Sequence, residues 1–372
     1  MRGIVIAAGG TGGHIFPALA LAREFKSAGI TTLVIGKTTA LLQSEFQKAG
    51  ISFQEIPVVR FPRKKTGLIL FPFRAAQAFF SAAACLLRFR PSAVIGMGGY
   101  ACAAPASVAT LLHIPLYFCE QNLLPGKVTR AFSRVSSAVF TSFPDSSRYL
   151  GAKRIMEFGN PLRPFAEKNE KAAARQKLKL DGQKFTVLVL GGSQGAHRIN
   201  QNISESLDYL SPREIQFIHL TGADDLSIMT ETYEKKKFQN YAEGFFPEMG
   251  LLYSAADLVI CRAGATTIAE LNFFGLPSIL IPYPFAAEDH QRLNASYLAG
   301  CGAAILREES TLNGEKLARE IKILVGDRQK LNLMSEAGRR LSHPEPAKHI
   351  VSLILSDLAR RSFSEGGPDK II

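Results

Sequence analysis

The chain has no tryptophan, and its five cysteines are widely spaced, without a Cys-x-x-Cys pair. An odd number of scattered cysteines argues against a disulfide scaffold and against a zinc site, and it suits a reducing cytoplasm. An apolar h-region with a cleavage site is also missing after Met1, so we expect no signal peptide. The length of 372 residues favours two domains.

Acidic residues are almost absent from one long stretch. Between Ile56 and Pro144 the only acidic residue is Glu120, against ten lysines and arginines. Such a positive field attracts an anionic membrane surface or a nucleic acid. Aromatic residues that alternate with Lys and Arg on strands, as in base-stacking surfaces, are missing. We therefore expect an anionic membrane surface as a partner and no nucleic acid.

A long uncharged run is also missing from the segment RFPRKKTGLILFPFRAAQAFFSAAACLLRFRPS, residues 60–92. The longest uncharged run in this segment covers residues 75–87, which is shorter than the ~18–20 residues that a membrane span needs. Apolar bulk flanked by Arg and Lys favours a surface that dips into a bilayer. The alternative is a buried crossover helix with a basic lead-in. The membrane contacts that we expect come from Arg63, Lys64, Lys65, Arg74, Phe79, Phe80 and Arg88.

Strand-like runs alternate with helical patterns along the whole chain, which predicts an α/β fold with parallel sheets covered on both faces. We expect helices at 17–28, 40–49 and 265–274. We expect strands at 4–7, 32–35, 93–95, 116–118, 138–140, 185–190, 216–220, 258–261 and 278–281.

The beginning of the chain is repeated in its second half. The segment FTVLVLGGSQGAHRIN has the same order of strand, glycines, hydroxyl residue, histidine and helix as GIVIAAGGTGGHIFPA. This repeat predicts two similar doubly wound domains, which we place at 1–162 and 163–343, with prolines and mixed charges between them. A last amphipathic helix at 344–361 is expected to pack on the first domain, and residues 362–372 to form a frayed tail.

The glycine loops lack two common nucleotide signatures. Gly10-Thr11-Gly12 is not followed by the third glycine of the dinucleotide fingerprint, and the second strand ends without an acid. A Gly-Lys-Ser/Thr sequence is absent from both loops, so NAD and P-loop chemistry are not expected. Glycines nevertheless let backbone amides approach a phosphate or a sugar beside a helix N-terminus. A tight turn without a ligand is the alternative for any single loop.

The segment CRAGATTIAEL combines features of a nucleotide site. The predicted helix that starts at Ala265 offers free amides and the hydroxyls of Thr266 and Thr267 to a diphosphate. Glu270 lies in its first turns, where it can accept hydrogen bonds from a ribose. An ordinary solvated glutamate is the alternative for this residue taken alone.

Seven motifs in this order carry a resemblance over nearly the whole chain: GGTGGH, GMGGY, EQN, GNPLR, GGSQGA, CRAGATTIAE and AAEDHQ. The chain resembles the family of peripheral-membrane N-acetylglucosaminyltransferases of bacterial peptidoglycan synthesis. The family resemblance implies the GT-B fold, in which two Rossmann-like lobes face each other across a cleft. It also implies transfer of GlcNAc from UDP-GlcNAc to the muramyl 4-hydroxyl of lipid I, with inversion, to form lipid II.

The resemblance further implies the residues that bind each substrate. Uracil would lie near Phe246, the ribose at Glu270, and the diphosphate at Ser193 and the start of the 265–270 helix. The full donor set would be Thr11, Gly12, Gly13, Asn122, Arg163, Ser193, Phe246, Ala265, Thr266, Thr267, Ile268, Ala269, Glu270 and Gln291. The acceptor would meet Gly10, Tyr100 and Asn122.

An inverting transfer needs a base for the acceptor hydroxyl and a group that stabilises the departing UDP. An imidazole is suited to the first task near neutral pH, so we expect His14 as the base, with Glu120 as the rival. A structural role for His14 in its loop is the alternative. Helix amides and Arg163 would serve the second task. A D-x-D motif is absent, so we expect no catalytic metal and no cofactor.

The chain departs from the family pattern after EQN, where it has Leu123 and Thr129 in place of a glycine and an asparagine. Acceptor contacts from this loop are therefore left open. The resemblance implies a peripheral location on the cytoplasmic face of the inner membrane, with cell-wall synthesis or division proteins as candidate partners. Rival functions are a glycolipid synthase that acts on diacylglycerol, a UDP-GlcNAc 2-epimerase and a UDP-sugar sensor without turnover.

Overall fold

The computed structural model describes residues 3–10, 12–60, 62, 65–163, 168–191 and 196–365. The chain divides into two compact units. Unit 1 comprises Met1–Arg163 and His343–Ile372, and unit 2 comprises Pro164–Ser342. Arg163 therefore belongs to unit 1, whereas the sequence pattern placed the boundary one residue earlier.

The sheet of unit 1 consists of parallel strands in the order β3-β2-β1-β4-β5-β6-β7. Its central strands are short apolar runs that are buried on both faces, which is typical of a parallel sheet between helical layers. The strands are β1 (Ile4–Ala7), β2 (Thr32–Gly36), β3 (Ser52–Glu55), β4 (Ala93–Gly96), β5 (Leu116–Glu120), β6 (Ala138–Thr141) and β7 (Ile155–Glu157).

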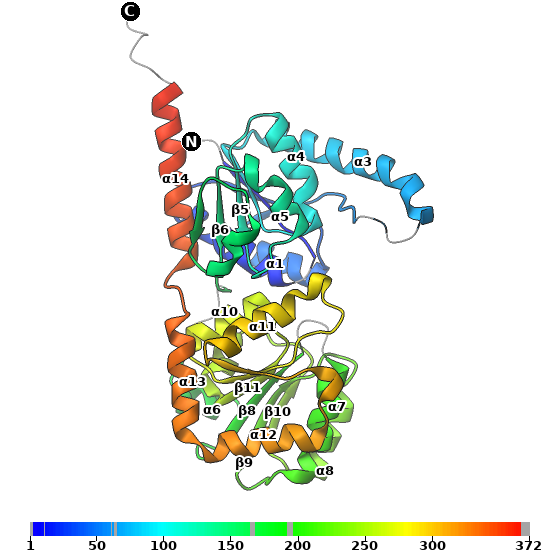
Figure 1. Ribbon diagram of the computed structural model, residues 1–372, viewed down its shortest axis with the longest axis vertical. Helices are drawn as coiled ribbons and strands as arrows, with labels where there is room; N and C mark the ends of the chain where they lie inside the picture. Colours follow the sequence, from blue (N-terminus) through cyan, green and yellow to red (C-terminus); the bar gives the residue numbers. More distant parts are fainter. Residues whose placement is uncertain are drawn as a thin grey trace, which may run out of the picture. The chain divides into compact units, whose positions relative to one another are not determined.

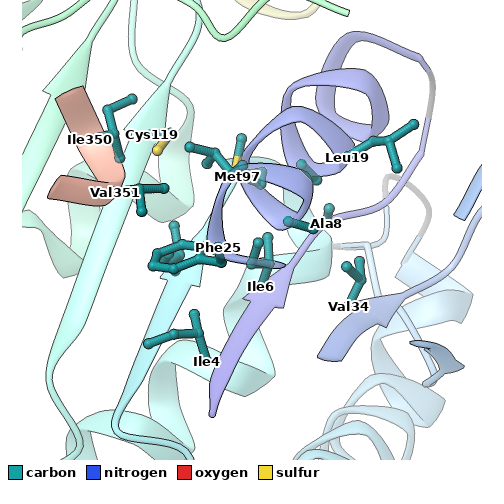
Figure 2. Close-up of a cluster of buried hydrophobic side chains, with 14 of the residues drawn as sticks. Ile4, Ile6, Ala8, Leu19, Phe25, Val34, Met97, Cys119, Ile350 and Val351 are labelled. Atoms are coloured by element: carbon teal, nitrogen blue, oxygen red, sulfur yellow. The ribbon is translucent and has the colours of Figure 1, made fainter. Parts of the chain in front are cut away.

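Helices from both ends of the chain cover this sheet (Figure 1). On one face α1 packs beside α14, and Phe25 of α1 lies in the same core as Ile350 and Val351 of α14 (Figure 2). A second core, with Ala82 and Leu86 of α3, lies on the other face. The helices are α1 (Gly12–Ser27), α2 (Ala40–Lys48), α3 (Lys65–Phe89), α4 (Ala103–Leu111), α5 (Lys127–Phe132) and α14 (Pro346–Glu365).

Unit 2 has a second parallel sheet, in the order β10-β9-β8-β11-β12-β13. Its strands are β8 (Phe185–Leu190), β9 (Ile215–Leu220), β10 (Asn240–Glu243), β11 (Leu258–Cys261), β12 (Ser278–Leu280) and β13 (Ala304–Leu306). Its helices are α6 (Lys171–Lys177), α7 (His197–Ser206), α8 (Leu226–Lys235), α9 (Met249–Ala255), α10 (Ala265–Phe274), α11 (His290–Gly300), α12 (Gly314–Gly326) and α13 (Arg328–Arg340).

The six strands of the second sheet, β10-β9-β8-β11-β12-β13, have the same order as β3-β2-β1-β4-β5-β6 of the first sheet, to which β7 adds a seventh strand. The strand that precedes the first glycine loop, β1, therefore has the same place in unit 1 as β8 has in unit 2. The internal repeat in the sequence is thus a repeat of architecture, and the predicted pair of doubly wound parallel sheets is confirmed.

Several predicted boundaries were wrong. Helix α1 begins at Gly12, not at Pro17, so Gly12, Gly13 and His14 lie in its first turn and not in a loop. Helix α14 continues to Glu365, past the point at which a frayed tail was expected. Strands β3, β7, β10 and β13 were not predicted.

Candidate functional site

Three loops of unit 1 meet at the carboxyl edge of its sheet. They follow β1, β4 and β5, and β1 and β4 are neighbours although they are not consecutive in the chain. The strand order reverses at this point, and ligands of open α/β sheets bind at such switch points. The loops carry the motifs GGTGGH, GMGGY and EQN.

Two glycines of the β4 loop leave room for the His14 ring. Gly98 and Gly99 have φ angles of +82° and +69°, which favour glycine. A Cβ atom on Gly99 would lie 3.3 Å from His14 Nε2, and one on Gly98 would lie 3.5 Å from His14 Cε1. The motif GMGGY therefore supplies a surface without side chains against which the imidazole packs.

His14 is joined to the β5 loop by a hydrogen bond. Its Nδ1 lies 3.0 Å from Oε1 of Gln121, which is buried directly after β5. Gln121 also donates from Nε2 to the carbonyl oxygen of Cys119, at 2.9 Å. The histidine and the EQN motif, which are far apart in sequence, thus form one side-chain assembly.

Glu120, the rival base, is used by its own loop. Its Oε1 accepts from the backbone N–H of Asn122 at 3.1 Å, and its Oε2 accepts from that of Gly126 at 3.0 Å. The side chain is only 2% exposed. A carboxylate that accepts two backbone N–H groups stabilises a loop conformation. This geometry favours a scaffolding role for Glu120 over proton transfer.

The predicted acceptor residues lie around this assembly. Gly10 has a φ of +89° and accepts a hydrogen bond from the Thr38 hydroxyl at its carbonyl oxygen. Tyr100 opens a short 3-10 helix and is partly exposed, and Asn122 is half-buried. Thr11 lies outside the described residues.

The two residues that depart from the family pattern are buried. Leu123 is 8% exposed and Thr129 is fully buried in the short helix α5. Neither side chain is therefore presented to a ligand on the surface.

Arg163 lies beside the start of α1. Its guanidinium carbon is 4.3 Å from the centre of the Phe16 ring, in a cation–π contact. Phe16 in turn packs close to Gly12, because a Cβ atom on Gly12 would lie 2.9 Å from that ring. Arg163 is therefore held near the first turn of α1 in unit 1.

In unit 2 the motif CRAGATTIAE forms the end of β11 and the start of α10. Gly264 is the N-cap of α10, which has the predicted bounds Ala265–Phe274. Thr267 and Ala269 are half-buried, whereas Ala265, Thr266 and Ile268 are buried. The first turn of α10 thus supplies backbone amides more than side chains.

Glu270 is not the solvated helix acid of the alternative interpretation. It is fully buried, and its Oε2 accepts a hydrogen bond of 2.7 Å from the hydroxyl of Tyr253 in α9. A buried carboxylate with a fixed partner has a defined orientation. Tyr253 was missed by sequence reasoning, and its spacing from Glu270 in the chain gives no signal.

The remaining residues that were predicted to bind the donor each have their own contacts. Gln291, at the start of α11, accepts from the backbone N–H of Tyr283 at 2.9 Å. Phe246 is half-buried and makes an edge contact with Tyr241. Ser193 lies outside the described residues.

Arg262 belongs to the motif CRAGATTIAE, but the sequence alone did not reveal its role. It donates to the carbonyl oxygens of Ile281 and Pro282 and forms an ion pair with Glu309. These contacts join the ends of β11 and β12 beside the start of α10. Its position directly after a buried strand was the available signal.

One side of helix α3 is buried, as the crossover-helix interpretation of this segment requires. Ala78, Ala82, Cys85 and Leu86, at helical spacing, are buried against the sheet, so α3 is a crossover helix between β3 and β4. Figure 1 shows α3 beside α4, with its first turns extending past it.

The other side of α3 is exposed and apolar. We call the side chains of Leu68, Ile69, Leu70, Phe73, Phe80 and Leu87 the α3 apolar face; they are between 45% and 74% exposed. Phe79 is not part of it, because its ring packs on the buried core. Arg74 and Arg88 are exposed beside it. Arg63 and Lys64 lie outside the described residues, and so does the side chain of Lys65.

The expectation that this segment is too short to span a membrane was wrong. In the described part of the chain, residues 68–89 form one helix that is long and apolar enough for a span by length and composition alone. The helix continues through Arg74 and Arg88, which the count of uncharged residues had treated as the ends of the run.

Metal ligands do not cluster in the described residues, where no group of three or more His, Cys, Asp or Glu side chains could hold an ion. The five cysteines are free thiols. Burial raises the pKa of Cys102 and of Cys261 to about 12, so these thiols are not nucleophiles at neutral pH.

Comparison with known proteins agrees with this architecture. The glycosyltransferase family 28 N-terminal domain matches residues 4–141, and the family 28 C-terminal domain matches residues 186–350. The chain belongs to glycosyltransferase family 28.

Curated relatives carry a more specific name. A protein of Anaeromyxobacter sp. (strain K) is 36% identical over 98% of this chain and 95% of its own length. A protein of Desulforamulus reducens is 38% identical over 96% of this chain and 99% of its own length. Both are named UDP-N-acetylglucosamine–N-acetylmuramyl-(pentapeptide) pyrophosphoryl-undecaprenol N-acetylglucosamine transferase.

Two solved structures are similar to this chain. The crystal structure of MurG from Acinetobacter baumannii is 29% identical, with a TM-score of 0.76 over 96% of this chain and all of that one. The glycosyltransferase of kitacinnamycin, 16% identical with a TM-score of 0.71, shares the fold.

Proposed function

We propose that the protein transfers GlcNAc from UDP-GlcNAc to undecaprenyl-pyrophosphoryl-MurNAc-pentapeptide, the lipid I to lipid II step of peptidoglycan synthesis. It is a hexosyltransferase that belongs to the same reaction class as its curated relatives, which match it over nearly their whole length. The observation that carries the proposal is the conjunction of this full-length match with two matching sheets whose switch-point loops hold the family motifs.

The donor is assigned to the loops of unit 2, with contributions from unit 1. We place the diphosphate at the N-terminus of α10 and at Ser193, because free helix amides favour an anion. We place the ribose at Glu270, whose orientation is fixed by Tyr253. The uracil is assigned to Phe246, and Thr11, Gly12, Gly13, Asn122, Arg163 and Gln291 complete the donor set.

The acceptor is assigned to unit 1, at Gly10, Tyr100 and Asn122. The muramyl 4-hydroxyl attacks the anomeric carbon in line with the departing UDP, which gives inversion. His14 takes the hydroxyl proton as general base. Glu120 holds the loop through its two backbone hydrogen bonds and leaves the proton to His14. The α10 amides and Arg163 stabilise the charge on the departing diphosphate.

The protein is proposed to bind the cytoplasmic face of the plasma membrane peripherally through the α3 apolar face. This face is exposed, and the surrounding stretch from Ile56 to Pro144 is basic apart from Glu120. Apolar side chains insert at the headgroup boundary while basic residues attract anionic lipid. A polyprenyl-linked acceptor requires such a location. Cell-wall synthesis or division proteins stay candidate partners.

The reaction is tested with labelled UDP-GlcNAc and a short-chain lipid I analogue. We expect a disaccharide-linked lipid product with the inverted anomeric configuration. Diacylglycerol and UDP-GlcNAc alone serve as controls for a glycolipid synthase and for a 2-epimerase. Product with diacylglycerol, or epimerised UDP-GlcNAc without an acceptor, would replace the proposal, and the absence of any transfer to the analogue would remove it.

The membrane proposal is tested by sedimentation with vesicles. The wild-type protein should bind anionic vesicles more strongly than neutral ones, and added salt should weaken the binding. Ile69→Ser with Phe73→Ser should weaken it further, since both side chains are 74% exposed on α3. Phe285→Ser, on a residue of unit 2 that is 80% exposed, is the matched control and should bind as the wild type does. Equal binding to neutral vesicles at high salt would contradict the electrostatic part.

A further inference from the structure

Gln121 makes two side-chain hydrogen bonds that together define its orientation. Its amide nitrogen Nε2 donates to the carbonyl oxygen of Cys119 at 2.9 Å, and its Oε1 lies 3.0 Å from Nδ1 of His14. The side chain is 2% exposed, so its contact to Cys119 is buried and its contact to His14 is partly buried. A backbone carbonyl can only accept, and therefore the NH₂ group of Gln121 must face Cys119.

This orientation determines which nitrogen of His14 carries the hydrogen. The Oε1 atom of Gln121 can only accept, so Nδ1 of His14 must be the donor. A neutral imidazole has one N–H, and the other nitrogen is then the basic one. With Nδ1 protonated, the basic nitrogen of His14 is Nε2.

We propose that Gln121 is a positioning residue that holds neutral His14 in the Nδ1–H tautomer, so that Nε2 is the atom that accepts the acceptor's proton. This inference rests on the proposed function and deepens it, because it assigns a role to a residue outside the proposed substrate-binding set. Free imidazole prefers the opposite tautomer, so the selection requires a fixed acceptor at Nδ1.

The step balances with this assignment. The hydroxyl oxygen of the acceptor forms its bond to the anomeric carbon, and its proton moves to Nε2 of His14. The bond between the anomeric carbon and the diphosphate oxygen breaks, and UDP leaves with that electron pair. The imidazolium that forms keeps its Nδ1–H bond to the Gln121 carbonyl oxygen, which is stabilised by the new positive charge.

A neutral amide suits a base that must release its proton after each turnover. A carboxylate in the same place would hold the proton more strongly and raise the pKa of the imidazole. The amide fixes the tautomer and the ring orientation with a smaller effect on basicity.

The surroundings keep Gln121 in this orientation. A Cβ atom on Gly98 would lie 3.5 Å from both Gln121 Oε1 and His14 Cε1, so both groups pack over this glycine. On the other side, Glu120 fixes the chain that carries Gln121 through the amides of Asn122 and Gly126. The motifs GMGGY and EQN therefore act together on one histidine.

The tautomer is measured by ¹⁵N NMR of the histidine rings in the full chain, without any substrate. His14 is assigned by its loss in His14→Ala, and the other six histidines are internal controls. We expect a protonated Nδ1 and an unprotonated Nε2 for neutral His14 in the wild type. Gln121→Met, which keeps the size and removes the acceptor, should shift the ring toward the Nε2–H form.

The kinetic consequence is measured as a pH profile of kcat/KM with UDP-GlcNAc and the lipid I analogue. Gln121→Met should lower kcat about 10- to 100-fold, with the KM for UDP-GlcNAc within about twofold of the wild type. Gln121→Glu should move the acidic limb of the profile upward by about one pH unit, because the carboxylate raises the pKa of His14. A purely structural role of Gln121 would lower the melting temperature and leave that limb in place.

The outcomes separate this inference from the proposed function. A wild-type His14 with Nε2–H, or an acidic limb that does not move in Gln121→Glu, overturns the role of Gln121 even if the enzyme transfers GlcNAc. The Nδ1–H tautomer together with the displaced limb supports it. Failure of the wild type to glycosylate the analogue removes the proposed function, and the NMR result then still decides the tautomer.

Discussion

In both units the first central strand leads through glycines to a helix with a histidine in its first turn, but the two histidines have different partners. In unit 1 the Nδ1 of His14 faces the amide oxygen of Gln121. In unit 2 the Nδ1 of His197 lies 2.9 Å from a carboxylate oxygen of Asp225, and its Nε2 lies 2.8 Å from the side-chain amide of Gln201.

The comparison separates what the repeated backbone supplies from what side chains decide. Equal strand order brings both histidines to the carboxyl edge of a sheet. A neutral amide oxygen faces Nδ1 of His14, whereas a carboxylate and an amide engage both nitrogens of His197. His197 therefore joins α7 to the start of α8, and of these two histidines we propose only His14 for catalysis.

The largest effect is expected from removing each histidine in turn. His14→Ala should lower kcat by about 10²- to 10⁴-fold, the usual contribution of a general base. His197→Ala should change kcat by less than about threefold, since surface contacts of this kind contribute little. Steady-state transfer assays measure both, and similar losses in the two variants would remove the distinction between the units.

The next expected effect concerns the pH dependence of stability, because unit 2 contains a completely buried histidine. His219 is held between Tyr233 and Asn200, and its burial lowers its pKa to about 3. In the described part of unit 1 the histidines are all at least partly exposed.

The unfolded chain takes up a proton at this histidine below pH ~6.5, whereas the folded chain does not until about pH 3. Stability from this group is therefore complete above pH ~6.5 and decreases as the pH falls, by about 1.4 kcal/mol per pH unit. Denaturant unfolding from pH 7 to 4.5 should show a steeper loss in the wild type than in His219→Gln. Parallel pH dependences would contradict the assignment.

Glu120 and Glu270, one buried glutamate in each unit, provide a third contrast. Glu120→Gln should lower the free energy of unfolding by about 1–3 kcal/mol, because one oxygen that accepts a loop N–H is lost. Glu270→Gln should instead raise the KM for UDP-GlcNAc about tenfold through the loss of a charged acceptor for the ribose. Thermal melts and initial rates distinguish these effects. Loss of turnover in Glu120→Gln at unchanged stability would make Glu120 the base.

The smallest effect compares two glycines with positive φ. Gly99→Ala and Gly302→Ala should each destabilise by about 1–2 kcal/mol, because both φ angles, +69° and +75°, disfavour a side chain. Only a Cβ on Gly99 would approach His14, while one on Gly302 would meet nothing within 4 Å. Gly99→Ala should therefore also lower kcat, and equal rates in both variants would show that the glycine does not shape the site.

The strands that the sequence did not reveal are the edge strands. β3 and β7 end the sheet of unit 1, and β10 and β13 end that of unit 2. An edge strand is covered less completely, and residues such as Ser52–Glu55 are mostly exposed, so a continuous apolar run is not required. The central strands, which are buried on both faces, were predicted nearly to the residue.

Side-chain roles were predictable only as far as residue type reveals chemistry. His14 and Glu120 were recognised because an imidazole and an isolated carboxylate suggest proton transfer, but their separate roles depend on hydrogen bonds between distant segments. Phe79 and Phe80 are adjacent, yet one packs on the core and the other is 69% exposed. The difference depends on which side of α3 faces the sheet, and the local sequence does not show which side that is.

The packing of α14 against α1 has a consequence for synthesis on the ribosome. Ile350, Val351, Ile354 and Leu358 complete the same core as β1 and α1, so the first half to be translated cannot close its core until the last helix has emerged. The strands and helices of unit 2, by contrast, are contiguous in the chain. Domains fold as units during translation, so the order of folding is expected to be the reverse of the order in the gene.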